Sequence, residues 1–195
     1  MANRGARGKM EISQEERSPL KLGINGLGRI GKLTLWHHVA RGSFSEVVVN
    51  IGREVGTGLD HVARYIERDS TYGYLGHYLY GHKSGRVIEN LNEEHGTMDV
   101  NGTPVTILRK DRNPKEIPWK NLKVPLVVDT TGKFLDPTIP PDHKSGSVLG
   151  HLQAGAQKVI VSAPFKIKDK SIISLFFSTT PSQVYSPNCS GCTIC

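Results

Sequence analysis

Apolar and polar positions along the first third of the chain predict strands that alternate with helices. Every second residue is apolar from position 20 to 24, which predicts a strand. From 30 to 40 apolar residues recur at helical spacing, and residues 47–50 predict a short buried strand. Residues 59–66 are apolar at i, i+3, i+4 and i+7, which predicts a second helix. The chain therefore opens as a βαβα unit.

The pattern changes between residues 86 and 108. Apolar positions there flank Asn101 and Gly102, a pair typical of the tight turn that joins two antiparallel strands. Beyond this predicted hairpin, residues 124–129 and 159–162 predict two more buried strands. A helix is predicted within 144–155. Strands that alternate with helices indicate a mostly parallel sheet with right-handed crossovers.

Composition divides the 195 residues into three parts. Residues 1–19 form an expected flexible basic extension, residues 20–170 an expected globular domain, and residues 171–195 a tail without any charged residue that holds all three cysteines. The 25 basic and 18 acidic residues give a net charge of +7, of which +3 lies in the first ten residues. A modestly basic protein is therefore expected rather than a nucleic-acid binder. Apolar runs are far shorter than the ~20 residues of a membrane-spanning helix.

The motif G-L-G-R-I-G lies between the first predicted strand and the first predicted helix, at residues 26–31. In this context the first glycine, Gly26, permits a tight turn, and Gly28 lets the backbone approach a pyrophosphate. Gly31 lets the helix pack closely on the strand. The helix then offers its unpaired N–H groups and positive dipole end to the phosphates. The motif predicts a dinucleotide site, although such a turn also occurs with a purely structural role.

One expected part of a NAD site is missing after the second strand. An acid there would accept the adenine ribose hydroxyls, but the chain has Asn50 and Ile51. Arg53 either pairs with the 2′-phosphate of NADP or is a solvated loop residue, and Glu54 is a second candidate for the ribose. The sequence leaves NAD and NADP both open.

Residues 21–168 resemble the nucleotide-binding half of glyceraldehyde-3-phosphate dehydrogenase, most closely its bacterial branch. The resemblance covers about three quarters of the chain, and the motifs occur in the order of the family. They are I-N-G-L-G-R-I-G at 24–31, E-R-D-S-T-Y-G at 67–73, V-N-G at 100–102, D-R-N-P from 111, I-P-W from 117, V-V-D-T-T-G-K-F at 127–134 and A-G-A-Q-K-V-I-V-S-A-P at 154–164.

The resemblance implies a cofactor-binding role for residues outside the glycines as well. Those on the pyrophosphate and nicotinamide side are Asn25, Arg29 and Ile30. The adenine side has Arg112, the ribose side has the turn Thr130, Thr131 and Gly132, and the nicotinamide side has Ser162. Simpler structural roles exist for some of them: Gly132 suits any such turn, Ser162 any strand end, and Arg112 any solvated hairpin.

The C-terminal tail departs from the family. The family's S-N-A-S-C-T-T-N-C segment, which carries the nucleophilic cysteine, is replaced by N-C-S-G-C-T-I-C at 188–195, and the family's second domain is expected to be missing. Cys192 has no identifiable basic partner that would make it a thiolate, and the histidines suit ordinary placement. No residue is therefore assigned a catalytic role. An out-of-frame or spliced tail is the preferred explanation.

Two other interpretations of the three cysteines are weaker. Cys189, Cys192 and Cys195 supply only three of the four ligands of a structural zinc site, so no metal is expected. The ending C-T-I-C fits a prenylation pattern only formally, because no polybasic run precedes it.

The sequence thus predicts an α/β, Rossmann-like doubly wound, mostly parallel sheet with an inserted antiparallel hairpin. The expected cofactor is NAD or NADP. The expected pathway is glycolysis, and the expected location is the cytoplasm. Alone, the chain is expected to bind the dinucleotide without catalysis. Its other expected partners are itself or full-length homologous subunits, because loss of a covering domain exposes apolar surface. The alternative is a non-catalytic nucleotide- or RNA-binding module or an assembly partner of the full-length enzyme.

Overall fold

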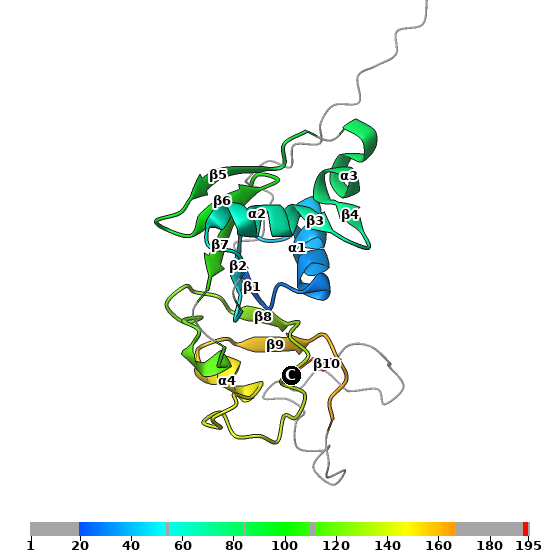
Figure 1. The fold of residues 1–195 in the computed structure, drawn as a ribbon. Coiled ribbons are helices and arrows are strands. Elements are labelled where there is room, and N and C mark those ends of the chain that lie inside the picture. Colours follow the sequence, from blue (N-terminus) through cyan, green and yellow to red (C-terminus); the bar gives the residue numbers. More distant parts are fainter. Residues whose placement is uncertain (1–19, 54, 84, 110–111, 167–192, 195) are drawn as a thin grey trace, which may run out of the picture.

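The computed structural model describes residues 20–53, 55–83, 85–109, 112–166 and 193–194. Its centre is an eight-stranded sheet, five strands of which run parallel in the order β7-β2-β1-β8-β9 (Figure 1). The five are β1 Lys21–Asn25, β2 Glu46–Asn50, β7 Thr103–Leu108, β8 Leu126–Asp129 and β9 Lys158–Val161. The strand order reverses at β1 and β8, as in a doubly wound α/β sheet. The predicted fold class is therefore confirmed.

Antiparallel strands extend both edges of this sheet. On one side β6 Thr97–Val100 pairs with β7, and β5 Ile88–Asn92 pairs with β6. Asn101 and Gly102 join β6 to β7 with φ angles of 51° and 69°, the positive values that the turn signal requires. The predicted hairpin is thus confirmed.

The opposite edge of the sheet has a short strand from the C-terminal tail. Thr193–Ile194 forms β10, which pairs with β9 in an antiparallel arrangement. Thr and Ile are β-branched residues, which favour the extended backbone of a strand. The rest of the tail, residues 171–192 and Cys195, lies outside the described residues.

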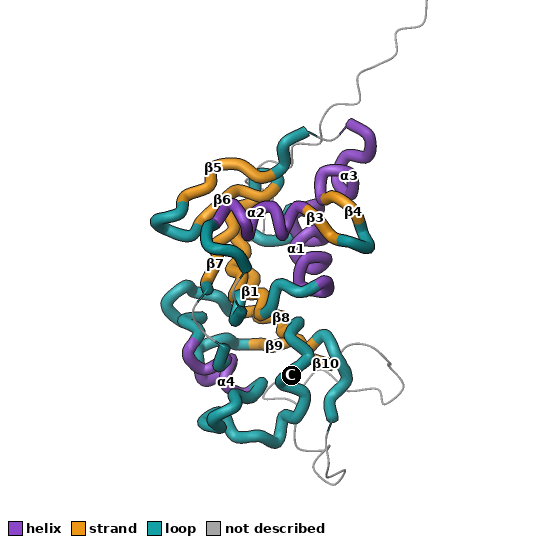
Figure 2. Tube along the Cα trace, in the orientation of Figure 1, coloured by secondary structure: helices purple, strands orange, loops and turns teal. Residues whose placement is uncertain are grey.

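The helices and short elements connect these strands (Figure 2). The helices are α1 Arg29–Arg41, α2 Leu59–Glu67, α3 Leu75–Tyr80 and α4 Leu149–Gln153, with the 3-10 turns η2 Gly81–Lys83 and η3 Pro114–Glu116. A small second sheet contains β3 Arg68–Asp69 and β4 Gly73–Tyr74. The three predicted helices match α1, α2 and α4. The small sheet and α3 were not predicted, because they are too short to carry a period.

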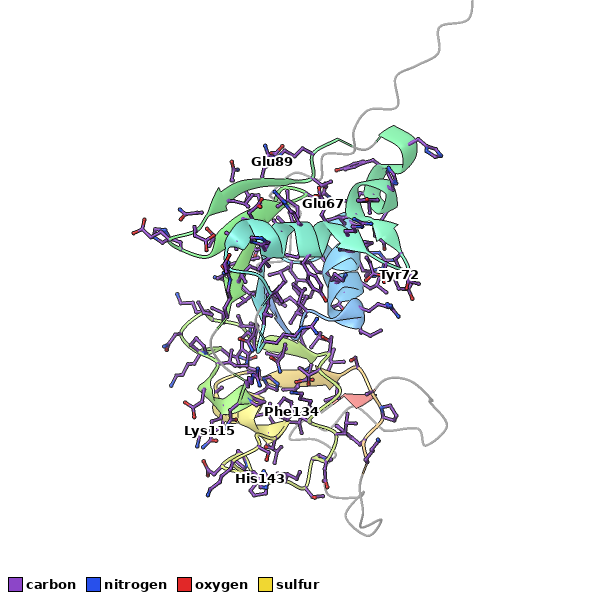
Figure 3. All side chains as sticks on the ribbon, in the orientation of Figure 1. Glu67, Tyr72, Glu89, Lys115, Phe134 and His143 are labelled. Carbon is purple, nitrogen blue, oxygen red and sulfur yellow. The ribbon has the colours of Figure 1, made fainter. Side chains whose placement is uncertain are left out.

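The core has two parts because the parallel strands are buried on both faces. Val47 and Val49 of β2 join the cluster under α1 and α2, whereas Val48 faces the opposite cluster. That second cluster contains Trp119 and Phe134, the latter in the loop after β8 (Figure 3). Strands buried on both faces read as continuous apolar runs, as in β2 and β8.

A buried ion pair holds the start of α1 against the segment after α2. Lys32 Nζ lies 2.8 Å from Asp69 Oδ2, donates to the Arg68 carbonyl at 2.8 Å, and sits 4.3 Å from the centre of the Tyr65 ring. The Lys32 hydrogen bond, joined by that from the Thr71 amide, lowers the pKa of Asp69 to about 2. The pair compensates for the charge of Lys32, which lies on the buried face of α1 with Leu35 and Trp36.

Replacement of Gly31 should test the packing of α1 on the turn after β1. A Cβ at Gly31 would lie 2.1 Å from the Gly26 carbonyl oxygen and 2.9 Å from Thr130 Oγ1. We expect Gly31→Ala to lower the free energy of unfolding by about 3 kcal/mol, because backbone rather than a flexible side chain must move. Denaturant unfolding measures the loss.

Gly28→Ala is the matched control, since a Cβ there meets nothing within 4 Å and φ is −78°. Equal stability of the two variants would contradict the prediction.

Candidate functional site

The carboxyl ends of β1 and β8 meet at a turn rich in glycine. Gly26 follows β1 with φ of 97°, and its N–H donates to the Asn50 carbonyl at 2.9 Å. From β8, the Thr130 amide donates to the Asn25 carbonyl at 2.9 Å, and its hydroxyl donates to the Gly26 carbonyl at 2.8 Å. The turn is therefore held from both neighbouring strands.

The start of α1 is open to an anion. Gly28 is the N-cap, makes no side-chain capping bond, and no acid lies in the first turn. The first N–H groups of a helix have no partner within it, and they carry the positive end of the dipole. A Cβ added to Gly28 would have no protein atom within 4 Å apart from its chain neighbours, so the space beside this residue is open. A phosphate group fits this combination of free amides and open space.

A buried polar network lies directly behind the turn. Asn25 Nδ2 donates to Asp129 Oδ2 at 2.8 Å, and Asn50 Nδ2 donates to Asn25 Oδ1 at 2.9 Å. His151 Nε2 lies 3.0 Å from Asp129 Oδ2, and Trp119 Nε1 donates to His151 Nδ1 at 2.9 Å. None of the five side chains is more than 3% exposed. The network joins β1, β2 and β8 to His151 in α4 and to Trp119 in the segment before β8.

The indole of Trp119 sets the direction of these hydrogen bonds. An indole N–H only donates, so His151 Nδ1 accepts and the imidazole proton is on Nε2, directed at Asp129. Burial raises the pKa of the Asp129 carboxyl, but hydrogen bonds from His151, Thr131 and Asn25 outweigh it and leave the pKa below its ordinary value. The other carboxylate oxygen accepts from the Thr131 amide and hydroxyl at 2.9 and 2.7 Å. Asp129 thereby orients the turn that follows β8.

The structure brings most of the predicted site residues to this edge. Arg29 and Ile30 lie in the first turn of α1 with exposed side chains, beside Gly28. On the other side, the Ser162 N–H donates to the Asp129 carbonyl at 2.9 Å. The predicted site residues that lie around the glycine turn are Asn25, Gly26, Gly28, Arg29, Ile30, Gly31, Thr130 and Thr131.

Three predicted residues lie farther from the glycine turn. Gly132 continues the turn after β8 with φ of 66° and an exposed position. Ser162 follows β9, and Arg112 lies beyond β7, where its Nε donates to the Gly52 carbonyl after β2. Their placement spans the carboxyl edge from β2 to β9.

The sequence reasoning missed Asp129, His151 and Trp119 as parts of the site. Asp129 was identified only as the end of a strand, and His151 only as one of the histidines with an ordinary placement. The available signal was an acid at the last position of a buried strand, which needs a partner when it is not exposed. The partners of Asp129 have no signal in the sequence, because Asn25 is 104 positions and His151 is 22 positions away from it.

The described residues offer neither a cluster of metal ligands nor a membrane-spanning helix. Nowhere among them do three or more His, Cys, Asp or Glu side chains gather as a metal-binding group. No helix in the described part of the chain is long and apolar enough to cross a membrane. All three cysteines lie outside the described residues, so the roles considered for them stay predictions.

The doubly wound sheet, the glycine turn and the uncapped start of α1 define a dinucleotide-binding domain. Residues 20–137 match the family described as "Glyceraldehyde 3-phosphate dehydrogenase, NAD binding domain". The chain belongs to the glyceraldehyde-3-phosphate dehydrogenase family, and the part that matches is its NAD-binding domain.

Curated relatives agree with this assignment. The chain is 32% identical over 154 residues to the glyceraldehyde-3-phosphate dehydrogenase of Heyndrickxia coagulans, a match that covers 79% of this chain and 38% of that protein. It is 31% identical over 146 residues to the cytosolic enzyme of Chondrus crispus, covering 75% and 36%. A chloroplastic enzyme of Arabidopsis thaliana is 33% identical over 168 residues, covering 86% and 33%. The chain thus spans less than two fifths of the length of these relatives.

Asp129→Asn should weaken the fold and change its response to acid. The new amide would direct N–H groups at donors, so we expect a loss of about 3 kcal/mol in the free energy of unfolding near neutral pH. Because the folded pKa of Asp129 is lowered, its contribution is present above the unfolded value and disappears as pH falls through the folded value. Urea unfolding between about pH 5 and pH 2 should therefore give a shallower acid dependence than in the wild type.

Asp142→Asn is the control for this experiment. Its pKa is also lowered, by Lys115, but its side chain is 70% exposed, so a small effect is expected. Superimposable acid dependences of Asp129→Asn and the wild type would contradict the role given to Asp129.

Proposed function

We propose that the chain binds a nicotinamide dinucleotide with its pyrophosphate against the start of α1. The supporting observation is the uncapped first turn beside Gly28, where a Cβ would have open space. Asn25, Gly26, Gly28, Arg29, Ile30 and Gly31 form the pyrophosphate side of the proposed site. The remaining contacts are assigned to Arg112 for adenine, to Thr130, Thr131 and Gly132 for ribose, and to Ser162 for the nicotinamide side.

The residues of this site bind and orient; they do not attack an aldehyde. The nicotinamide ring, when bound, supplies a hydride acceptor. Among residues 20–166 that the structure describes there is no cysteine. His151 is fully buried, and both ring nitrogens are engaged, by Trp119 and Asp129. Neither a thiolate nor an accessible imidazole base is therefore available in the described site.

Gly28→Ala should separate binding from folding. We expect an unchanged free energy of unfolding but an affinity for NAD roughly 10- to 100-fold weaker, because the methyl group occupies the space proposed for the pyrophosphate. Isothermal titration of the folded variant with NAD measures the change. Wild-type affinity in this variant would place the pyrophosphate elsewhere.

The relatives' names suggest the substrate of the complete family enzyme, glyceraldehyde 3-phosphate. We expect this chain alone to bind NAD yet form no NADH from glyceraldehyde 3-phosphate, NAD and phosphate, because the described residues of its site include neither a cysteine nucleophile nor an accessible histidine base. Absorbance of NADH is the measurement, with a full-length relative as positive control. Turnover by the purified chain, free of contaminating enzyme, would refute the non-catalytic part of the proposal.

Association is a second candidate property, with a second copy or with full-length homologous subunits. Four tyrosines, each between 42% and 51% exposed, lie in the segment from the turn between β3 and β4 to the end of α3. The first of them, Tyr72, lies at that turn (Figure 3). The four are Tyr72, Tyr74, Tyr78 and Tyr80. Tyrosine is enriched in the buried centres of protein interfaces, so this segment favours assembly over a nucleic-acid role.

A further inference from the structure

At the end of β2, Asn50 and Ile51 occupy the positions where a NAD site has an acid, and the side-chain amide of Asn50 is engaged inside the sheet. Asn50 is 1% exposed, and its Nδ2 donates to Asn25 Oδ1 inside the sheet. Ile51, the next residue, is buried as well. In dinucleotide sites an acid near this point accepts the ribose hydroxyls, whereas an arginine nearby accommodates a 2′-phosphate. Among the described residues, the first exposed charge after β2 is Arg53.

Two guanidinium groups are fixed around the loop that follows β2. Arg53 Nη2 donates to the Tyr65 hydroxyl at 2.9 Å, and its guanidinium lies 5.8 Å from the centre of that ring. Arg112 Nε donates to the Gly52 carbonyl from the other side of the loop. Each of these bonds uses part of a five-donor group, so each arginine retains donors for a ligand.

Tyr65 also forms a wall of a basic depression that begins at the first turn of α1. This arginine groove has a volume of about 550 Å³. Its charged and aromatic lining residues are Arg29, Lys32, Arg64, Tyr65, Arg68 and Asp69. Four cations thus face one anion, and that anion is already paired with Lys32 at 2.8 Å.

The arginines of the groove have room to bind an anion. Arg29 is 54% exposed and lies 3.7 Å from Asp69, too far for a hydrogen bond. Arg64 forms a surface pair with Asp60, and Arg68 lies over the Tyr74 ring at 5.6 Å. The groove therefore extends from the proposed pyrophosphate site at Arg29 to Tyr65, which Arg53 contacts.

We propose that Arg53 and the arginine groove bind the 2′-phosphate of NADP, so that this chain prefers NADP to NAD. The inference rests on the proposed dinucleotide site, because the ribose is placed at the end of β2 only when the pyrophosphate lies at α1. A phosphate on the 2′ oxygen then meets guanidinium groups, whereas the one carboxylate among the described residues that line the groove, Asp69, is already paired with Lys32. Planar guanidinium groups are the preferred partners of phosphate oxygens.

The test is isothermal titration of the full chain with NADP and with NAD. We expect NADP to bind about 10- to 100-fold more tightly than NAD, the factor that one charge-assisted contact provides. Arg53→Gln should remove most of this difference by weakening NADP alone, and Arg68→Gln should weaken NADP in the same direction. Arg41→Gln is the control, because it removes the same charge at the far end of α1.

Thermal unfolding of each variant verifies that it is folded before titration. Equal affinity for the two cofactors, or an Arg53→Gln variant that loses NAD and NADP alike, would overturn the preference and leave the dinucleotide site intact. Binding of neither cofactor to the folded wild type would overturn the dinucleotide site and this inference with it. Gly28→Ala distinguishes the two sites, since it should weaken both cofactors equally.

Discussion

The close approach of α1 to the turn after β1 is the contact on which the site depends. Gly31 lies so near the Gly26 carbonyl that a single added carbon would overlap it. This contact fixes the angle at which α1 leaves the sheet, and with it the direction of the free amides beside Gly28. Lys32, the next residue, pairs with Asp69 and holds the start of α1 against β3. Packing and ligand recognition are therefore two consequences of one local geometry.

The same edge of the sheet must satisfy several buried polar groups without water. Asp129 is fully buried, yet it accepts hydrogen bonds from Asn25, Thr131 and His151. Burial of a carboxylate with fewer donors would destabilise the fold, whereas this many hydrogen bonds lower the pKa of Asp129 below its usual value. The described side chains best suited to acid–base chemistry, Asp129 and His151, are thus hydrogen-bonded within the protein. Backbone amides and arginines remain to contact a ligand.

Sequence periodicity predicted the elements whose side chains alternate between core and solvent, and it failed where the determinants are distant. The βαβα opening and the Asn101–Gly102 turn depend on neighbours within a few positions, so their patterns are visible in the sequence. The glycine turn belongs to this group too. The contact of His151 with Trp119 joins residues 32 positions apart, and that of Asn25 with Asp129 joins residues 104 apart. Lys32 did carry a signal, since a lysine on the apolar face of a helix requires a buried partner.

Asn50 links the stability of the sheet to the cofactor preference proposed for this chain. Its amide N–H donates to Asn25 Oδ1, which leaves the Asn25 amide to donate to Asp129. A carboxylate at position 50 has no proton for the first of these bonds, and it would place a second negative charge behind the same turn as Asp129. The network therefore disfavours an ionised acid at the end of β2. Without that acid, Arg53 is the first exposed charge described after the strand, so the arrangement that stabilises β1, β2 and β8 also leaves a basic side chain at the proposed adenosine end of the site.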